Sequence, residues 1–283
     1  MPALDNMQHP SPASNAANAS GGVLLRARHD GAIAVLTLNR PQQRNALSLE
    51  LIADMHAAII DSGKDTTVAA IVISANGPVF SAGHDLKELT AHRADADGGR
   101  AFFAQTMDAC SALMQAIVAC PKPVIAAVEG TATAAGCQLV ATCDLAIAAE
   151  GAEFGTPGVN IGLFCSTPMV ALSRNVPRKQ AMEMLLLGET MTAVDAVRYG
   201  LVNHAVPKDR VMPDALDMAE RIAAKSKMTV AIGKAAFYRQ TELPLGDAYA
   251  YAAEVMVDNM MRADANEGIC AFIGKRPPLW SDQ

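Results

Sequence analysis

Two short segments of small residues have the composition to bind a developing negative charge through backbone N–H groups. Residues 79–87 follow an apolar run that ends near Ser74, and residues 130–138 follow the apolar run 123–128. A buried strand that passes through small residues into a helix exposes main-chain N–H groups and lets a ligand approach them closely. If the two strands are neighbours in one parallel sheet, one donor from each segment can point at the same oxygen, as an oxyanion hole requires.

Both segments also have a simpler interpretation. A tight strand-to-helix turn explains the first, and close helix packing explains the second equally well. Asp85 and Asp144 are suited to capping or bracing turns, and Cys137 and Cys143 to buried packing positions. The chemical interpretation therefore depends on the elements that position the two segments.

Those elements alternate in type along the chain. Two apolar runs, 23–25 and 33–38, flank Asp30-Gly31 and predict a β-hairpin. A continuous apolar run rich in β-branched residues at 68–74, with similar runs at 123–128 and 145–149, predicts parallel strands buried on both faces. Helical spacing of apolar residues follows Ser48 and recurs at 102–118, 179–187 and 214–224. Strands that alternate with helices imply βαβ crossovers and a layered α/β fold.

Three regions are expected along the chain. Residues 1–22 are rich in Ala, Ser, Asn and Pro and predict a disordered tail without a secretory signal or transit peptide. Residues 23–200 form the α/β core, and residues 201–283 form a helical C-terminal region. The apolar faces of that region, which include Ala248, Met256 and Met260, exceed what one thin layer buries, so contacts between subunits are expected.

Composition narrows the class of protein. A formal net charge of −6, without a run of basic residues, argues against a nucleic-acid groove. No apolar run approaches the ~20 residues of a membrane span. The six cysteines lack zinc-ligand spacing and indicate reduced, buried thiols in a cytoplasmic protein, so no metal is expected.

Several motifs, taken together in their order and spacing, resemble the crotonase (enoyl-CoA hydratase/isomerase) superfamily from about residue 22 to the end. They are Leu38-Asn39-Arg40-Pro41, Asn45-Ala46-Leu47, Phe80-Ser81-Ala82-Gly83-His84-Asp85-Leu86, Gly136-Cys137-Gln138-Leu139 and Cys143-Asp144, continued by Phe154-Gly155-Thr156-Pro157-Gly158 and by Ala193-Val194-Asp195-Ala196 through Gly200-Leu201-Val202. The resemblance implies a spiral of ββα units, a helical C-terminal region that forms a homotrimer or a dimer of trimers, and acyl-CoA thioester substrates. Coenzyme A would enter as part of the substrate, with no separate cofactor.

The resemblance also implies roles for individual residues. The backbone N–H groups of His84 and Ala135 would be the oxyanion donors that polarise the thioester carbonyl toward an enolate. The other implied positions contact the CoA portion, and the last two of them reach the CoA of a neighbouring subunit: Arg44, Ala46, Ala82, Asp85, Leu86, Lys87, Phe272 and Lys275. Without the resemblance, Lys87 and Lys275 would be read as ordinary solvated lysines.

The chain departs from the family pattern at the two carboxylates. Where the family's hydratases have two glutamates, this chain has Gln138 and Gly158. An amide does not titrate and glycine has no side chain, so neither residue can transfer the protons that hydration of an enoyl thioester needs. Each such group contributes roughly 10²- to 10⁴-fold to the rate, so ordinary hydration is expected to be very slow.

Three functional hypotheses follow. The first is a hydratase- or isomerase-like enzyme that stabilises an enolate and takes its base from His84, Cys165 or Ser166. The second is a non-catalytic protein that binds or sequesters acyl-CoA, and the third is a structural oligomer without CoA affinity. Turnover of a thioester separates the first from the second, and CoA binding separates the second from the third.

Overall fold

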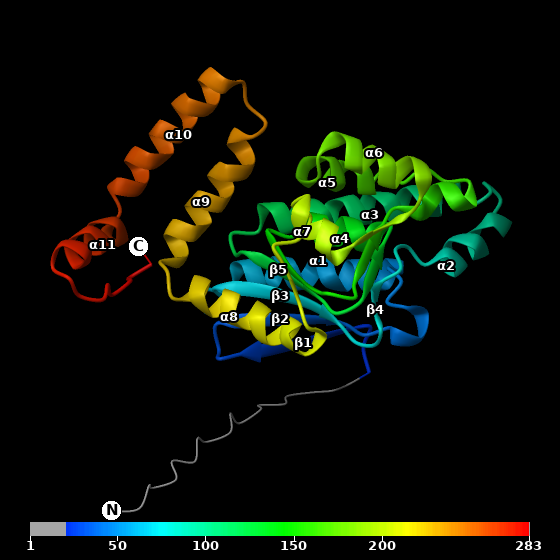
Figure 1. Ribbon diagram of the computed structural model, residues 1–283, viewed down its shortest axis with the longest axis horizontal. Helices are drawn as coiled ribbons and strands as arrows, with labels where there is room; N and C mark the ends of the chain where they lie inside the picture. Colours follow the sequence, from blue (N-terminus) through cyan, green and yellow to red (C-terminus); the bar gives the residue numbers. More distant parts are fainter. Residues whose placement is uncertain (1–20, 283) are drawn as a thin grey trace, which may run out of the picture.

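The computed structural model describes residues 21–282 as two sheets surrounded by helices (Figure 1). The larger sheet has six strands in the order β1 (Leu24–His29), β2 (Ile33–Leu38), β3 (Ala70–Ala75), β5 (Val124–Val128), β7 (Leu145–Ala149) and β10 (His204–Val206). The smaller sheet has the order β4 (Val79–Ser81), β6 (Thr131–Thr133), β8 (Glu153–Gly155) and β9 (Thr190–Thr192). Each of β3, β5 and β7 is followed along the chain by a strand of the smaller sheet. The chain therefore winds as a spiral, which confirms the predicted α/β fold of ββα units.

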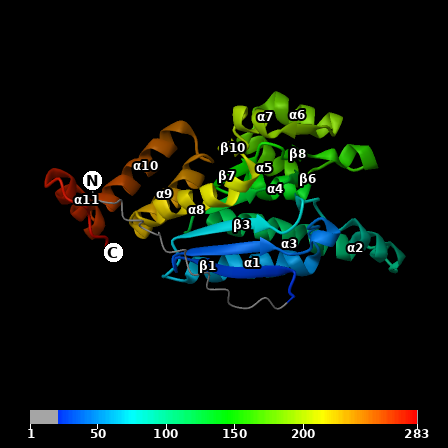
Figure 2. The same ribbon diagram turned by 60° about the horizontal axis from the view of Figure 1, so that its bottom comes forward.

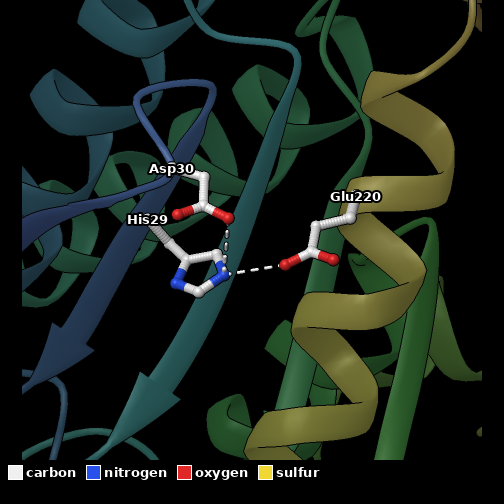
Figure 3. A group of neighbouring side chains, drawn as sticks. All are labelled: His29, Asp30 and Glu220. Carbon is white, nitrogen blue, oxygen red and sulfur yellow. Dashed lines mark hydrogen bonds and ion pairs between the residues drawn. The ribbon is translucent and has the colours of Figure 1, made fainter. Parts of the chain in front are cut away.

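The predicted hairpin is formed by β1 and β2, which pair antiparallel with Leu24 opposite Leu38. At the turn, Asp30 and Gly31 have φ values of 47° and 72°, a left-handed geometry that suits this dipeptide. The end of the hairpin contacts helix α8 (Val211–Ala223), because Nε2 of His29 lies 2.8 Å from Oε1 of Glu220 and 3.7 Å from Oδ2 of Asp30 (Figure 3). These partly exposed side chains join the hairpin to α8 at the surface of the protein. The hairpin turn contains neither of the two predicted oxyanion donors, His84 and Ala135.

Strands β3 and β5 are buried along almost their whole length, so both faces of the larger sheet are covered. Helix α8 packs on β3, β5 and β7, while α1 (Leu49–Lys64) contacts β1 and β2 and packs against α3 (Arg100–Ala119) (Figure 2). As predicted, Ser48 caps α1: its side chain accepts a hydrogen bond from the N–H of Leu51. The remaining helices of the core are α2 (Leu86–Ala91), α4 (Ala135–Thr142), α5 (Pro168–Asn175), α6 (Arg178–Leu187) and α7 (Ala193–Arg198), with short 3₁₀ turns at Pro41–Gln43, His92–Ala94, Pro157–Ile161 and Lys208–Arg210.

The region after residue 200 starts within the core rather than outside it, because β10 pairs with β7 and α8 covers the sheet. The remaining helices, α9 (Lys227–Gln240), α10 (Leu245–Met260) and α11 (Ala263–Ile273), extend away from the sheets, and we refer to them as the C-terminal arm (Figure 1). Several large apolar side chains of the arm are exposed in the single chain: Leu245, Tyr249, Met256, Val257, Met260 and Ile269. The predicted tail falls outside the described residues except for residues 21 and 22.

Among the contacts between the arm and the core is a buried group of three side chains, Asp144, Lys234 and Tyr238, which we call the latch. Nζ of Lys234 donates to Oδ2 of Asp144 at 2.7 Å and to the carbonyl oxygens of Ile117 and Lys122 at 2.9 and 3.0 Å. The Tyr238 hydroxyl donates to Oδ1 of Asp144 at 2.9 Å. Burial and the neighbouring Asp144 carboxylate raise the pKa of Tyr238, so its hydroxyl remains a donor. Asp144 is thus a structural brace rather than a group free for chemistry.

Candidate functional site

The site is built on a buried asparagine in the loop after β2. Asn45 is fully buried; its Oδ1 accepts from the N–H of Arg40, and its Nδ2 donates to the carbonyls of Asn76 and Val79 at 2.9 and 2.7 Å. Ser81 donates its hydroxyl to the carbonyl of Asn45 at 2.9 Å. These bonds fix the 40–47 loop against β4, which leads directly to His84.

The first candidate donor is the N–H of His84. Leu47 and His84 form a parallel bridge in which the N–H of Leu47 donates to Gly83 and the N–H of Asp85 donates to Leu47. This pattern leaves the N–H of His84 on the other side of the chain, and within residues 21–282 no backbone carbonyl accepts from it. The amide is therefore free to donate to a ligand.

The second candidate donor is the N–H of Ala135, the first residue of α4. The first backbone N–H groups of a helix have no partner within the helix, and in the described part of the chain no carbonyl accepts from Ala135. Two nearby backbone N–H groups do form hydrogen bonds. The N–H of Ala134 donates to the carbonyl of Gly155 at 2.8 Å, and the N–H of Gln138 donates to the carbonyl of Ala134 at 3.0 Å.

Two glycines bring these donors together. A Cβ atom added to Gly83 would lie 2.7 Å from the Ala134 Cβ and 3.2 Å from the Ala135 nitrogen, and one added to Gly136 would lie 2.4 Å from the Ser81 carbonyl oxygen. Only glycine permits such close approach of two main chains. The two segments are therefore in direct contact, through parallel pairing of β4 and β6, and their free N–H groups are neighbours.

Ala134, immediately before the second donor, has φ 50° and ψ −120°, a conformation that disfavours residues with a Cβ. We expect Ala134→Gly to raise the free energy of unfolding by about 0.5–1 kcal/mol, because relief of ~1–2 kcal/mol of strain exceeds the extra entropy of glycine in the unfolded chain. Urea unfolding measures this change.

The matched control is Gly83→Ala, at φ +88° and in contact with Ala134, which we expect to destabilise the protein. A lower stability of Ala134→Gly than of the wild type would show that the backbone of Ala134 is not strained.

At the two glutamate positions of the family, the structure contains no carboxylate. Gln138 is buried in α4, and its Oε1 has no hydrogen-bond partner among the described residues. Gly158 is also buried, and a Cβ atom there would lie 2.6 Å from the Leu163 carbonyl oxygen and 2.8 Å from Sγ of Cys165. Position 158 therefore has no side chain, and the surrounding atoms leave no room for one.

The three candidate bases differ in their surroundings. Burial lowers the pKa of His84, and both ring nitrogens are shielded from solvent without a described partner, so the imidazole is neutral near pH 7. Burial raises the pKa of the Cys165 thiol. Ser166 is exposed, and its hydroxyl donates to the carbonyl of Phe164 at 3.3 Å. None of the three has the environment of an activated base.

The positions predicted to contact CoA fall into two places. Arg44, Ala46 and Ala82 lie together, since the N–H of Ala82 donates to the Arg44 carbonyl at 3.0 Å, and Leu86 and Lys87 are exposed in the first turn of α2. Asp85 caps α2 and pairs with Arg40 at 2.8 Å; despite its partial burial, these contacts lower the pKa of Asp85. Phe272 and Lys275 lie at the end of α11, at the opposite end of the molecule from α2 (Figure 1), so the single chain does not bring them to His84.

Sequence reasoning missed several residues that shape the site. Arg40, Asn45 and Ser81 were noted only as parts of motifs, although their hydrogen bonds position the loop and β4. Thr156 was noted only within the motif 154–158: it is buried, its Oγ1 has no partner among residues 21–282, and it follows Gly155, which accepts from Ala134. The signal that could have identified Thr156 was a polar residue between Gly155 and Pro157, next to the strand residue that pairs with the segment 130–138.

The comparison with protein families matches residues 28–283 to the enoyl-CoA hydratase/isomerase family. The chain belongs to this family. Enoyl-CoA hydratase domain-containing protein 3 from mouse, named as mitochondrial, is 46% identical over 272 residues, which cover 96% of this chain and 89% of the relative. Its rat and human counterparts carry the same designation, which contradicts the predicted cytoplasmic location.

Solved structures agree with this membership. The crystal structure of an enoyl-CoA hydratase from Mycobacterium smegmatis is 47% identical with a TM-score of 0.87, over 92% of this chain and 99% of that one. The human domain-containing protein 3 is 46% identical with a TM-score of 0.87, over 92% and 100%. These matches confirm the crotonase-like fold. They also confirm the resemblance to domain-containing protein 3, which the sequences of residues 158–168 and 275–280 indicate as well.

Proposed function

We propose that this enoyl-CoA hydratase/isomerase-family chain binds acyl-CoA thioesters and stabilises an enolate, without acting as an ordinary hydratase. The observation that supports the proposal is the pair of free N–H groups at His84 and Ala135, held together by Gly83 and Gly136. Such donors act on charge that develops at a carbonyl oxygen and need no titratable group. Gln138 and Gly158 stand where acid–base residues would be needed for water addition.

Assembly follows from the same reasoning. The exposed apolar face of the arm, with Phe272 in α11 and Lys275 just beyond it, favours a homotrimer or a dimer of trimers. In such an assembly, the arm of one subunit can reach a thioester bound to another. Within residues 21–282 no helix combines the length and apolar character needed to cross a bilayer.

The test measures binding and product mass for the purified protein with saturated and unsaturated acyl-CoAs. We expect measurable affinity, with hydration of a short enoyl-CoA at least ~10⁴-fold slower than in a two-glutamate enzyme, because two groups worth roughly 10²- to 10⁴-fold each are missing. Efficient water addition would contradict the argument from Gln138 and Gly158. The absence of any thioester binding would instead favour a structural oligomer.

A non-catalytic, sequestering protein remains the second candidate, supported by the same missing carboxylates and by the lack of an activated base. It predicts tight binding without product for every thioester. Turnover of any thioester by the wild-type protein decides against it.

A further inference from the structure

A histidine and two carboxylates meet where the β1–β2 hairpin contacts α8 (Figure 3). Nε2 of His29 lies 2.8 Å from Oε1 of Glu220 and 3.7 Å from Oδ2 of Asp30. All three atoms lie within 4.8 Å of one another. Imidazole nitrogens and carboxylate oxygens are ligands that zinc accepts, at about 2.0–2.2 Å. The group therefore offers three candidate ligands for one divalent ion.

The hairpin turn is what places Asp30 beside His29. Successive side chains of an extended strand point to opposite faces of the sheet, so two neighbours in a strand do not face each other. His29 is the last residue of β1, and Asp30 has φ 47°, in the left-handed region. This conformation ends the alternation and brings the Asp30 carboxylate to the side of the imidazole. Glu220, in the last turn of α8, approaches the same imidazole from the helix (Figure 3).

The separations of the ligand atoms suit a tetrahedral ion. Two ligands bonded to zinc at about 2.0–2.2 Å with tetrahedral angles lie roughly 3.3–3.6 Å apart. The observed separations of 2.8 and 3.7 Å lie on either side of this range. The side chains of Asp30 and Glu220 are 78% and 48% exposed, so both have room to rotate by the small amount needed. A water molecule would complete the four-coordinate shell, as at other zinc sites with three protein ligands.

The charges around the group favour a cation. Asp30 and Glu220 carry two negative charges, and among residues 21–282 His29 is the one basic side chain that pairs with either carboxylate. The neighbouring arginines in the sequence, Arg28 and Arg221, pair with other aspartates instead. In the described part of the chain no lysine or arginine therefore competes with an ion for these oxygens.

We propose that His29, Asp30 and Glu220 bind one zinc ion that links the hairpin to α8. Nε2 of His29 gives its lone pair to the ion and the ring proton resides on Nδ1, while Oδ2 of Asp30 and Oε1 of Glu220 supply two further bonds. The ion fastens the last turn of α8, from which the chain continues into the arm, to the edge of the larger sheet. No short spacing in the sequence indicates this site, because His29 and Glu220 are 191 residues apart. The inference is independent of thioester binding.

The experiment strips the full-length protein of metal with a chelator and titrates it with zinc chloride in a calorimeter. We expect one ion bound per chain, and a Tm that rises by roughly 5 °C once free zinc exceeds the Kd about 100-fold. His29→Gln should weaken this binding about 100-fold or more, because loss of a group that only supports a ligand already costs about 10- to 100-fold in metal affinity. Glu220→Gln should weaken it by about tenfold or more on the same grounds.

The matched control is His92→Gln. The His92 side chain is as exposed as that of His29, 37% against 35%, but its imidazole pairs with one carboxylate only, that of Asp95 at 2.8 Å. Because this pair offers two ligands rather than three and lies apart from the hairpin, its loss should leave the zinc affinity within about twofold of the wild type.

Each outcome decides for or against this site. Loss of zinc binding in both His29→Gln and Glu220→Gln, with retention in His92→Gln, supports it. Equal zinc affinity in His29→Gln and the wild type would place the ion elsewhere, for example on the exposed thiol of Cys270, and overturns the proposal. Absence of zinc binding by the wild type also overturns it, whether or not the same sample binds acyl-CoA. If His29→Gln fails to fold, Asp30→Asn keeps the test decisive, since asparagine tolerates the left-handed turn and unchanged affinity there contradicts the three-ligand site.

Discussion

Lys234→Met will lower the free energy of unfolding by about 3–5 kcal/mol, the range for breaking one side of a buried ion pair. The two charged side chains of the latch are largely buried, with side-chain exposures of 7% for Lys234 and 15% for Asp144. The substitution removes three donated hydrogen bonds at once and leaves the Asp144 carboxylate with only the Tyr238 hydroxyl and the N–H of Val124. Chemical denaturation monitored by circular dichroism measures the loss.

The control for this result is an ion pair of the same kind on the surface. Arg221 pairs with Asp217 at 3.7 Å, and both side chains are more than half exposed, so Arg221→Ala should change stability by no more than about 0.5 kcal/mol. Combining Lys234→Met with Asp144→Leu should recover part of the loss, because the unpaired charge is then removed. Equal stability of Lys234→Met and the wild type would show that the latch does not hold the arm.

Gly136→Ala will weaken acyl-CoA binding about 10- to 100-fold and lower stability by about 1–3 kcal/mol. The added Cβ would lie 2.4 Å from the Ser81 carbonyl oxygen and 2.7 Å from its Cβ, and neither belongs to a flexible side chain. Such overpacking typically costs 1–3 kcal/mol. Because α4 must then move away from β4, the two N–H groups separate, and loss of two hydrogen bonds at about 0.5–1.5 kcal/mol each corresponds to the stated change in affinity. Calorimetric titration with an acyl-CoA measures it.

A second glycine-to-alanine change isolates this effect. Gly233 lies within α9, and a Cβ atom there would have nothing within 4 Å, so Gly233→Ala should stabilise the protein by about 0.5–1 kcal/mol and leave affinity unchanged. Wild-type affinity in Gly136→Ala would mean that the spacing between α4 and β4 does not set the geometry of the donors.

The longer elements were predictable because each carries a periodic signal of its own. The hairpin around Asp30-Gly31, the helix capped by Ser48 and the buried strands β3, β5 and β7 all follow local composition. The smaller sheet was not predicted, since its strands have only three residues each and cannot show a period of two. The same holds for β10, which also has three residues and lies in the region 201–283 that was expected to be helical.

For the site, the identity of the residues could be predicted from the sequence, but the distances between them could not. The missing carboxylates at Gln138 and Gly158 were visible from motif position alone. The contact between Gly158 and Cys165 depends on how the 158–165 loop closes, and the latch joins Asp144 to side chains 90 and 94 residues away. Such long-range pairings have no local signature, so Lys234 and Tyr238 could not be singled out beforehand.

Helix α4 links the chemistry to the shape of the whole chain. Its first turn carries the N–H of Ala135, and two residues beyond its last turn stands Asp144, which holds the arm. Eight residues of helix span only about 12 Å, so a single short helix separates the oxyanion donor Ala135 from Asp144, which binds the arm. We therefore expect the arm and the donor to unfold together as one cooperative unit, and detachment of the arm to loosen the segment that ends α4.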